Sequence, residues 1–172
     1  MRLTKRKVIA AIIFIIISVT AQFIPFEKKE NQQNNSLFKI TRVIDGDTIE
    51  IEGGKTVRYI GIDAPELHHP KKPVQCFAKE AYEKNKELVE GKMVKLEKDV
   101  SEKDKYKRLL RYVFLYDPLS TSEALFVNKY LVAEGFVHAA TFPPDVKYAD
   151  IFVSEQRNAT MNKKGLWSSC YN

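Results

Sequence analysis

Three short segments of alternating apolar and polar residues constrain the fold of this chain more than any other feature of its sequence. The segments cover residues 38–44, 48–52 and 56–62, and the dipeptide Gly53-Gly54 separates the second from the third. Alternation with a period of two is typical of a strand that buries one face, and Gly-Gly between two such runs favours a hairpin turn. The sequence therefore predicts a three-strand meander.

Helices and two further strands are predicted after the meander. Residues 63–74 contain three prolines and are predicted to form a loop. Residues 76–90 contain no Gly or Pro and place Ala81 and Leu88 on one helical face, so we expect a helix that ends near Gly91. The other predicted elements are strands over 93–97 and 109–116, a helix that ends at Glu134, an extended segment over 136–140 and a helix over 146–163.

The helix that ends at Glu134 has two candidate starts. Ser120 with Glu123 matches a capping box, whereas Asn128 could cap a shorter helix. With either start, the order of elements predicts an α+β domain. A five-stranded β-barrel of the OB type with three helices accommodates this order.

The N-terminus has the layout of an export signal. Residues 2–7 are basic, residues 8–19 are nearly all apolar, and the apolar character continues weakly to Phe26. This arrangement indicates a cleaved signal peptide or an uncleaved signal anchor, and it places the rest of the chain outside the cytoplasm. Small residues favour cleavage after Ala21, while a retained leader would contact the membrane through residues 8–26.

The sequence thus divides into a signal or anchor segment over 1–26, a polar linker over 27–36 and a folded domain over 37–172. The expected location is extracytoplasmic, either secreted or anchored in the membrane with the domain outside. No feature of the chain forces oligomerisation, so a monomer is expected.

The two cysteines, Cys76 and Cys170, favour a disulfide in an extracytoplasmic chain. Such a bond would tie the C-terminal tail to the segment that follows residue 70. The alternative is a pair of free thiols, since the spacing has no metal-site character.

The net charge is weaker evidence for a nucleic-acid partner than its value of +6 suggests. Residues 1–36 hold six of the 28 basic side chains and two of the 22 acidic ones, which leaves +2 for the folded part. Any attraction to phosphate must therefore come from the local placement of charges.

Charged residues gather at the predicted strand ends. Asp45-Gly46-Asp47-Thr48 follows the first strand, Arg58 lies within the third, and Asp63-Ala64-Pro65-Glu66 follows the third directly. Because these strand ends can be neighbours, Asp47 and Asp63 are candidates to meet on the barrel rim. Carboxylate oxygens are ligands that Ca²⁺ accepts, although each motif alone could be an ordinary solvated turn.

In this order and spacing, the motifs resemble those of the staphylococcal nuclease (thermonuclease) family. The matching segments are 43–48, 57–66, 104–109, 126–135 and 164–168, and the resemblance covers roughly residues 38–169. The family implies an OB-type barrel with three helices and Ca²⁺-dependent hydrolysis of DNA and RNA that leaves 3′-phosphate ends. By this resemblance, Asp47 and Asp63 are expected to bind Ca²⁺ together with the backbone carbonyl of Ala64.

The resemblance also assigns catalytic and substrate-binding roles. Glu66 is similar to the residue that activates or orients the attacking water. Arg58 and Arg108 resemble the pair that binds the scissile phosphate, where guanidinium groups can bind the developing negative charge. Lys105 and Tyr106 are the expected substrate contacts.

Two positions depart from the family pattern. Lys107 stands where the family usually has Gly before the second arginine, and it would cost roughly 1 kcal/mol if the backbone there needs a positive φ. Arg108 could then be replaced in its role by Arg111. The family's best-known member presents stacking tyrosines in the stretch that matches residues 141–144. Here only Phe142 is aromatic, so altered base preference or weaker substrate binding is expected.

Other functions remain as alternatives. One is a non-catalytic OB-fold module that binds nucleic acid at the membrane, and another is a membrane-tethered interaction domain. His68 and His69 lie in the Pro-rich loop and are expected to be solvated, and His138 is expected to be structural.

Overall fold

The computed structural model describes residues 36–68, 71, 73–117 and 124–171. The predicted leader and residues 27–35 of the predicted linker lie outside these ranges, as do Ser120 and Glu123. Within the described ranges, no helix has the length and apolar character needed to cross a bilayer.

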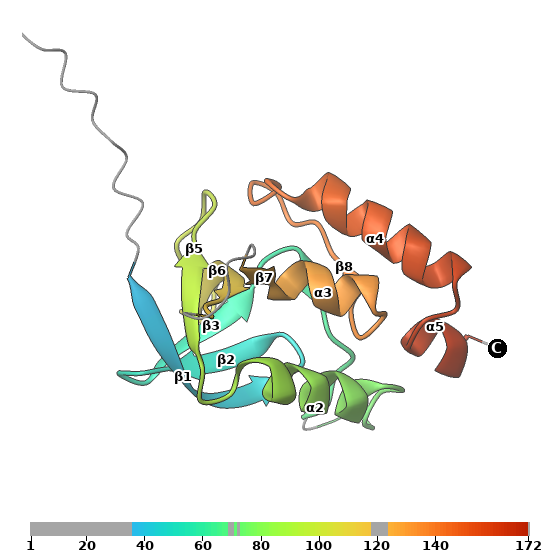
Figure 1. Ribbon diagram of the computed structural model, residues 1–172, viewed down its shortest axis with the longest axis horizontal. Coiled ribbons are helices and arrows are strands. Elements are labelled where there is room, and N and C mark those ends of the chain that lie inside the picture. The colour runs from blue at the N-terminus through green and yellow to red at the C-terminus, as the bar shows by residue number, and fades with distance from the viewer. Residues whose placement is uncertain (1–35, 69–70, 72, 118–123, 172) are drawn as a thin grey trace, which may run out of the picture. The chain divides into compact units, whose positions relative to one another are not determined.

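Five strands close into a barrel, as the sequence predicts (Figure 1). The strands are β1 (Leu37–Asp45), β2 (Thr48–Ile51), β3 (Lys55–Tyr59), β5 (Met93–Glu97) and β6 (Leu109–Leu115). β1 pairs with β2 and β5, β2 pairs with β3, and β5 pairs with β6, all antiparallel, while a parallel pairing of β3 with β6 closes the ring. Closure satisfies the strand edges, as in other small barrels of the OB type.

β1 contributes to both sides of the barrel because it is irregular. Its first three residues pair with β5, and Ile40 to Asp45 pair with β2. The register shifts between Ile40 and Arg42 and again between Val43 and Asp45. Such irregularities increase the local twist and bend of a strand, which allows one strand to serve two neighbours in a small barrel.

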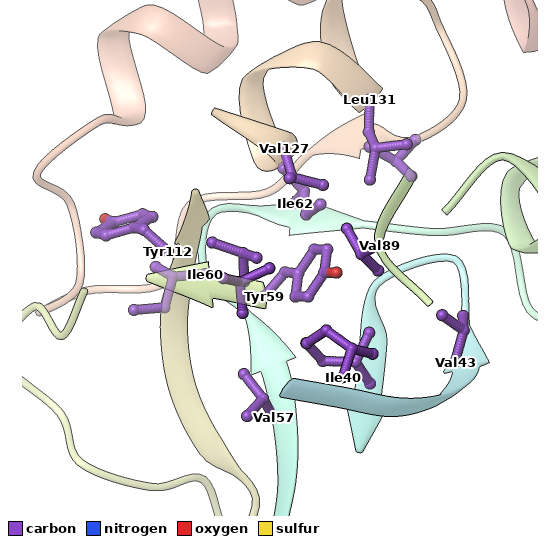
Figure 2. Packing of buried hydrophobic residues seen from close by; sticks show 14 of the residues in the cluster. Ile40, Val43, Val57, Tyr59, Ile60, Ile62, Val89, Tyr112, Val127 and Leu131 are labelled. Carbon is purple, nitrogen blue, oxygen red and sulfur yellow. The ribbon is translucent and has the colours of Figure 1, made fainter. Parts of the chain in front are cut away.

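Apolar side chains from the barrel and the helices form one core (Figure 2). Tyr59 lies among these residues and is 2% exposed, yet its hydroxyl donates a hydrogen bond to Asn85 Oδ1 at 3.0 Å. Asn85 in turn donates to the carbonyl of Asp45 at 3.0 Å. The buried phenol is therefore satisfied, and the same contacts tie helix α2 to the end of β1.

The helices pack on the outside of the barrel. α2 (Ala78–Val89) contacts β1, and α3 (Val127–Ala133) lies between β6 and α4 (Ala149–Met161) (Figure 1). A further short helix, α5 (Leu166–Ser169), lies beyond the last predicted helix, which was expected to end at residue 163, and was not predicted. Cys170 follows α5 and forms a disulfide with Cys76, which precedes α2.

Both candidate starts for the helix before Glu134 are wrong. Leu125–Phe126 form strand β7, which pairs with the end of β6, so the helix does not extend back to Ser120. Asn128 is not a cap, because its buried side chain accepts a hydrogen bond from the Val113 N–H and donates one to the Ile60 carbonyl. Tertiary contacts therefore decide where α3 begins.

The third predicted strand ends earlier than expected. β3 stops at Tyr59, and the chain turns at Gly61, where φ is +79°. A Cβ atom at Gly61 would lie 2.3 Å from the ring of Phe152, so both the backbone and the packing require glycine here. After the turn, Ile62–Asp63 form β4, which pairs with β8 (His138–Ala139) outside the barrel.

Candidate active site on the barrel rim

The loop between β1 and β2 packs tightly against the segment that follows β4. A Cβ atom on Gly46 would lie 2.7 Å from Ala64 Cβ and 3.0 Å from Ala81 Cβ, so only glycine permits this approach. The carboxylate of Asp47 accepts a hydrogen bond from the Ala64 N–H at 2.6 Å and one from the Thr48 hydroxyl at 2.9 Å. The side chain of Asp47 is 7% exposed, so these bonds compensate for its loss of water.

Arg58 lies between the two predicted carboxylate ligands. Its Nη1 is 2.9 Å from Asp47 Oδ2, and its Nη2 is 2.7 Å from Asp63 Oδ1. Nη1 also donates to the carbonyls of Tyr59 and Ile62, at 3.2 and 2.9 Å. The guanidinium is thereby fixed at the turn after β3. Because the side chain of Asp63 is 60% exposed, the arrangement opens to solvent on that side.

The electrostatics of this rim favour a cation. Burial raises the pKa of Asp47, and the Arg58 charge and the hydrogen bonds from Ala64 and Thr48 oppose that rise. Burial also raises the pKa of Asp45 to about 6, with a further contribution from the charges of Asp47 and Glu66. The acidic groups thus lie in a poorly hydrated place where additional positive charge would favour their ionised forms.

The backbone of Glu66 is held in place by Gln75. Its N–H donates to Gln75 Oε1 at 2.8 Å, and the Gln75 N–H donates to the Glu66 carbonyl at 3.0 Å. The Glu66 carboxylate accepts a hydrogen bond from the His68 N–H at 3.2 Å. Gln75 directly precedes the disulfide-bonded Cys76, so the covalent link to Cys170 lies next to the hydrogen bonds between Gln75 and Glu66. The sequence contained no pattern that singled out Gln75.

Arg108 is oriented by Asp104. The guanidinium Nε lies 2.6 Å from Asp104 Oδ2, and Asp104 Oδ1 accepts the N–H groups of Tyr106 and Arg108, both at 2.9 Å. Lys107, within this tight turn, has a φ of 68°, which is the left-handed conformation that glycine adopts most readily. Arg111, the predicted substitute for Arg108, pairs instead with Glu102.

One cavity of about 450 Å³ brings most of the predicted site residues together. Its lining includes Ile44, Asp45, Asp47, Thr48, Thr56, Arg58, Asp63, Ala64, Glu66, His68, Tyr106 and Arg108. His68 was expected to be merely solvated, and it is exposed, yet it faces the same cavity as Glu66. Lys105 is not part of this lining.

A neighbouring cavity of about 460 Å³ is lined by two exposed aromatic side chains. Tyr106 and Phe142, which are 68% and 65% exposed, both line it, together with Lys105. Arg58 and Arg108 line this cavity as well as the first one. The two arginines therefore lie between a cluster of carboxylates and a pair of aromatic side chains.

The donor chemistry of the rim fits a hard cation. Asp47 and Asp63 already lie within 3 Å of a single cationic group, the Arg58 guanidinium. Across the described residues, no three His, Cys, Asp or Glu side chains converge as a metal cluster. An ion bound here would accordingly depend on the two carboxylates with main-chain oxygen and water, a mixture that Ca²⁺ accepts because its coordination is loose.

Comparisons with known proteins agree with the geometry. Residues 56–169 match the family described as staphylococcal nuclease homologue. The chain is 37% identical over 166 residues to a thermonuclease of Staphylococcus hyicus and covers 94% of each chain. It is 33% identical over 172 residues to a thermonuclease of Staphylococcus intermedius, covering 94% of this chain and 98% of the relative. It is also 38% identical over 144 residues to the endonuclease YncB of Bacillus subtilis, covering 81% of this chain and 65% of the relative.

Proposed function

Because this chain belongs to the staphylococcal nuclease family and is a nuclease that hydrolyses phosphodiester bonds, we propose that it is a Ca²⁺-dependent endonuclease that leaves 3′-phosphate ends on DNA and RNA. The observation that carries the proposal is the position of Arg58. Its guanidinium bridges Asp47 and Asp63 and faces the cavity that Glu66 and Arg108 also line.

The two arginines bind the scissile phosphate in this proposal. Negative charge grows on the phosphoryl oxygens as water attacks phosphorus, and a planar guanidinium can donate two parallel hydrogen bonds to those oxygens. Arg108 is already oriented by Asp104, so little side-chain freedom is lost when phosphate binds. Arg58 has the same advantage because two main-chain carbonyls hold its Nη1.

Glu66 accepts the proton of the attacking water. The carboxylate lines the cavity beside Arg58 and Arg108, and its backbone is anchored on Gln75. Attack opposite the 5′-oxygen breaks the bond between phosphorus and that oxygen, which gains a proton from solvent and leaves as a 5′-hydroxyl, so the phosphate stays on the 3′ side. Asp47, Asp63 and the Ala64 carbonyl supply oxygen donors for Ca²⁺, which when bound acts as a Lewis acid on a phosphoryl oxygen.

Tyr106 and Phe142 bind a base next to the cleaved bond. Both rings are largely exposed and line one cavity, and Lys105 Nζ lies 5.0 Å from the Tyr106 ring centre. Stacking of a base on such a ring contributes about 1–3 kcal/mol and tolerates any sequence. The aromatic contact therefore suits single strands, whose bases are accessible.

We also propose an extracytoplasmic location, as a secreted or membrane-anchored monomer. The basic and apolar order of residues 2–19 supports export. The disulfide between Cys76 and Cys170 supports an oxidising compartment.

The test is cleavage of single-stranded DNA and RNA with Ca²⁺ and with excess chelator. Wild-type protein is expected to cut only with Ca²⁺, and Glu66→Gln is expected to lose on the order of 10²–10³ in rate. Glu83→Gln, which changes an exposed carboxylate on α2, is the matched control. Cutting that survives the chelator would contradict the metal, and mass spectra showing 5′-phosphate ends would contradict the bond assignment. Folded protein that binds oligonucleotides without cutting them would instead be a binding module.

A further inference from the structure

A third hollow continues from the active-site cavity along the start of β3 and β6. It has a volume of about 480 Å³, and we call it the lysine groove. Its lining consists of Gly54, Lys55, Thr56, Glu102, Lys103, Tyr106, Lys107, Arg108 and Leu109. Thr56, Tyr106 and Arg108 also line the active-site cavity, so the two hollows share a wall.

The parallel pairing of β3 with β6 creates this groove. Val57 lies opposite Leu109 in the register, so the residues before each strand emerge at the same edge of the barrel. Lys55 begins β3, while a backbone bridge between Lys103 and Leu109 holds the loop before β6. Lysines that are about fifty residues apart in the sequence therefore face one hollow.

The positive charge of the groove is largely uncompensated. Lys55, Lys103 and Lys107 are exposed, and within the described residues none of their ammonium groups forms a hydrogen bond or a close ion pair, although the charge of Lys103 interacts with that of its neighbour Glu102. Glu102 is the one acidic residue in the lining, and it pairs with Arg111 and lies 3.7 Å from Lys98. A folded part with a net charge of only +2 thus places three lysines without a close ion-pair partner among the described residues beside Arg108.

Lys107 adds a cation at a position that disfavours a side chain. Its φ of 68° costs about 1–2 kcal/mol for a residue other than glycine. The ammonium group emerges from the turn that presents Arg108, next to the expected site of the scissile phosphate. The groove therefore extends the positive surface from the active site outward.

We propose that the lysine groove binds the backbone phosphates of the substrate strand beyond the cleaved bond, so that the enzyme favours strands of several nucleotides over dinucleotides. This inference rests on the proposed nuclease function. Lysine is a flexible point charge that binds phosphate without reading sequence. Phosphates in the groove would release counterions and make binding strongly dependent on salt.

The test compares the triple variant Lys55→Gln, Lys103→Gln, Lys107→Gln with a triple variant of exposed lysines elsewhere, Lys39→Gln, Lys92→Gln, Lys163→Gln. Binding of a single-stranded 12-mer is measured against salt concentration, with Glu66→Gln present in every protein to prevent cleavage. Each phosphate contact on a single strand contributes about 0.7 to the slope of log affinity against log salt. The groove variant should lose about 2 units of slope, and the control should keep the wild-type slope.

A kinetic comparison uses the same lysine changes with Glu66 intact. The ratio of kcat/KM for the 12-mer to that for a dinucleotide should fall by about tenfold or more in the groove variant. An unchanged slope together with an unchanged ratio would overturn the proposal. If the triple variant does not fold, Lys55→Gln alone, at an exposed hairpin end, tests the same point. Its slope of log affinity against log salt concentration should fall by about 0.7.

The failure of this inference is distinguishable from failure of the proposed function. Wild-type protein that cuts neither substrate contradicts the nuclease mechanism, but the binding slopes still decide whether the groove contacts phosphate. Wild-type protein that cuts both substrates, beside a groove variant that behaves identically, overturns the groove alone.

Discussion

Gln75 and Glu66 exchange two hydrogen bonds across the loop that carries the proposed general base. The Gln75 side-chain oxygen accepts the Glu66 N–H at 2.8 Å, and the Gln75 N–H donates to the Glu66 carbonyl at 3.0 Å. Neither bond involves the Glu66 carboxylate, which accepts one hydrogen bond from the His68 N–H and keeps its other oxygen for water. Gln75 is therefore a positioning residue, because its contacts fix the backbone from which Glu66 reaches the cavity.

Replacing Gln75 should reduce the rate of the chemical step. Gln75→Ala removes the side-chain acceptor, and a displacement of Glu66 by about 1 Å would lower kcat by roughly ten- to a hundredfold. KM should change much less, since the proposed mechanism assigns phosphate binding to Arg58 and Arg108. Gln75→Glu keeps an oxygen acceptor and should restore most of the rate. Equal losses in the two variants, measured by steady-state kinetics, would rule out this positioning role.

Removing the disulfide should destabilise the fold. Cys76 and Cys170 are 94 residues apart, and loss of such a crosslink typically costs about 2–5 kcal/mol. Urea unfolding of a Cys76→Ser, Cys170→Ser variant measures this cost against wild-type protein under the same conditions. A change below about 1 kcal/mol would show that the tail is held mainly by other contacts.

Arg58→Ala should destabilise the protein by about 3–5 kcal/mol, because it leaves the buried Asp47 carboxylate without its counter-charge. Added Ca²⁺ should restore positive charge and raise the Tm of this variant more than that of wild-type protein. Arg157→Ala, an exposed change on α4, is the control and should behave like wild type. If Ca²⁺ raised the Tm of Arg58→Ala and of wild-type protein equally, the result would argue against a cation beside Asp47.

Lys107→Gly should separate backbone strain from charge. Glycine adopts the φ of 68° readily, so the free energy of unfolding should rise by about 0.5–1 kcal/mol, while oligonucleotide binding becomes less dependent on salt. Lys107→Ala removes the same charge but retains the strain, and it should weaken binding without stabilising the fold. Chemical denaturation and salt titrations measure both effects. A glycine variant less stable than the alanine variant would contradict this account.

Asp104 should contribute stability only where it is ionised. Burial raises the pKa of Asp104, but hydrogen bonds from the Arg108 guanidinium and from the backbone outweigh burial and hold the pKa below its ordinary value of 3.8. The contribution is therefore present above the pKa of the unfolded chain and is lost as pH falls through the lower folded pKa.

Asp104→Asn should accordingly lower the free energy of unfolding by about 1–2 kcal/mol at pH 7. The difference in the free energy of unfolding between the variant and wild-type protein should become smaller below about pH 4. Urea titrations at several pH values measure this difference, and a constant gap down to pH 2 would exclude ionisation as its source.

The sequence predicted the barrel strands because period-two alternation is a local property of a half-buried strand. It failed where distant contacts override local preference. Leu125 and Phe126 extend along β6, and the Phe126 ring stacks on Phe114 with centroids 4.5 Å apart, so α3 starts later than a capping box predicts. β3 ends early because Gly61 turns against Phe152, a residue far along the chain.

The sequence by itself determined the barrel strands, the turn glycines and the acidic and basic residues that could carry chemistry, because each depends on short-range spacing. Only the tertiary structure decided which of those charges meet. Arg58 lies between Asp47 and Asp63, and Lys55 joins Lys103 and Lys107 in one groove, because strand pairing closes the barrel. These long-range contacts depend on the register between strands, which no local pattern encodes.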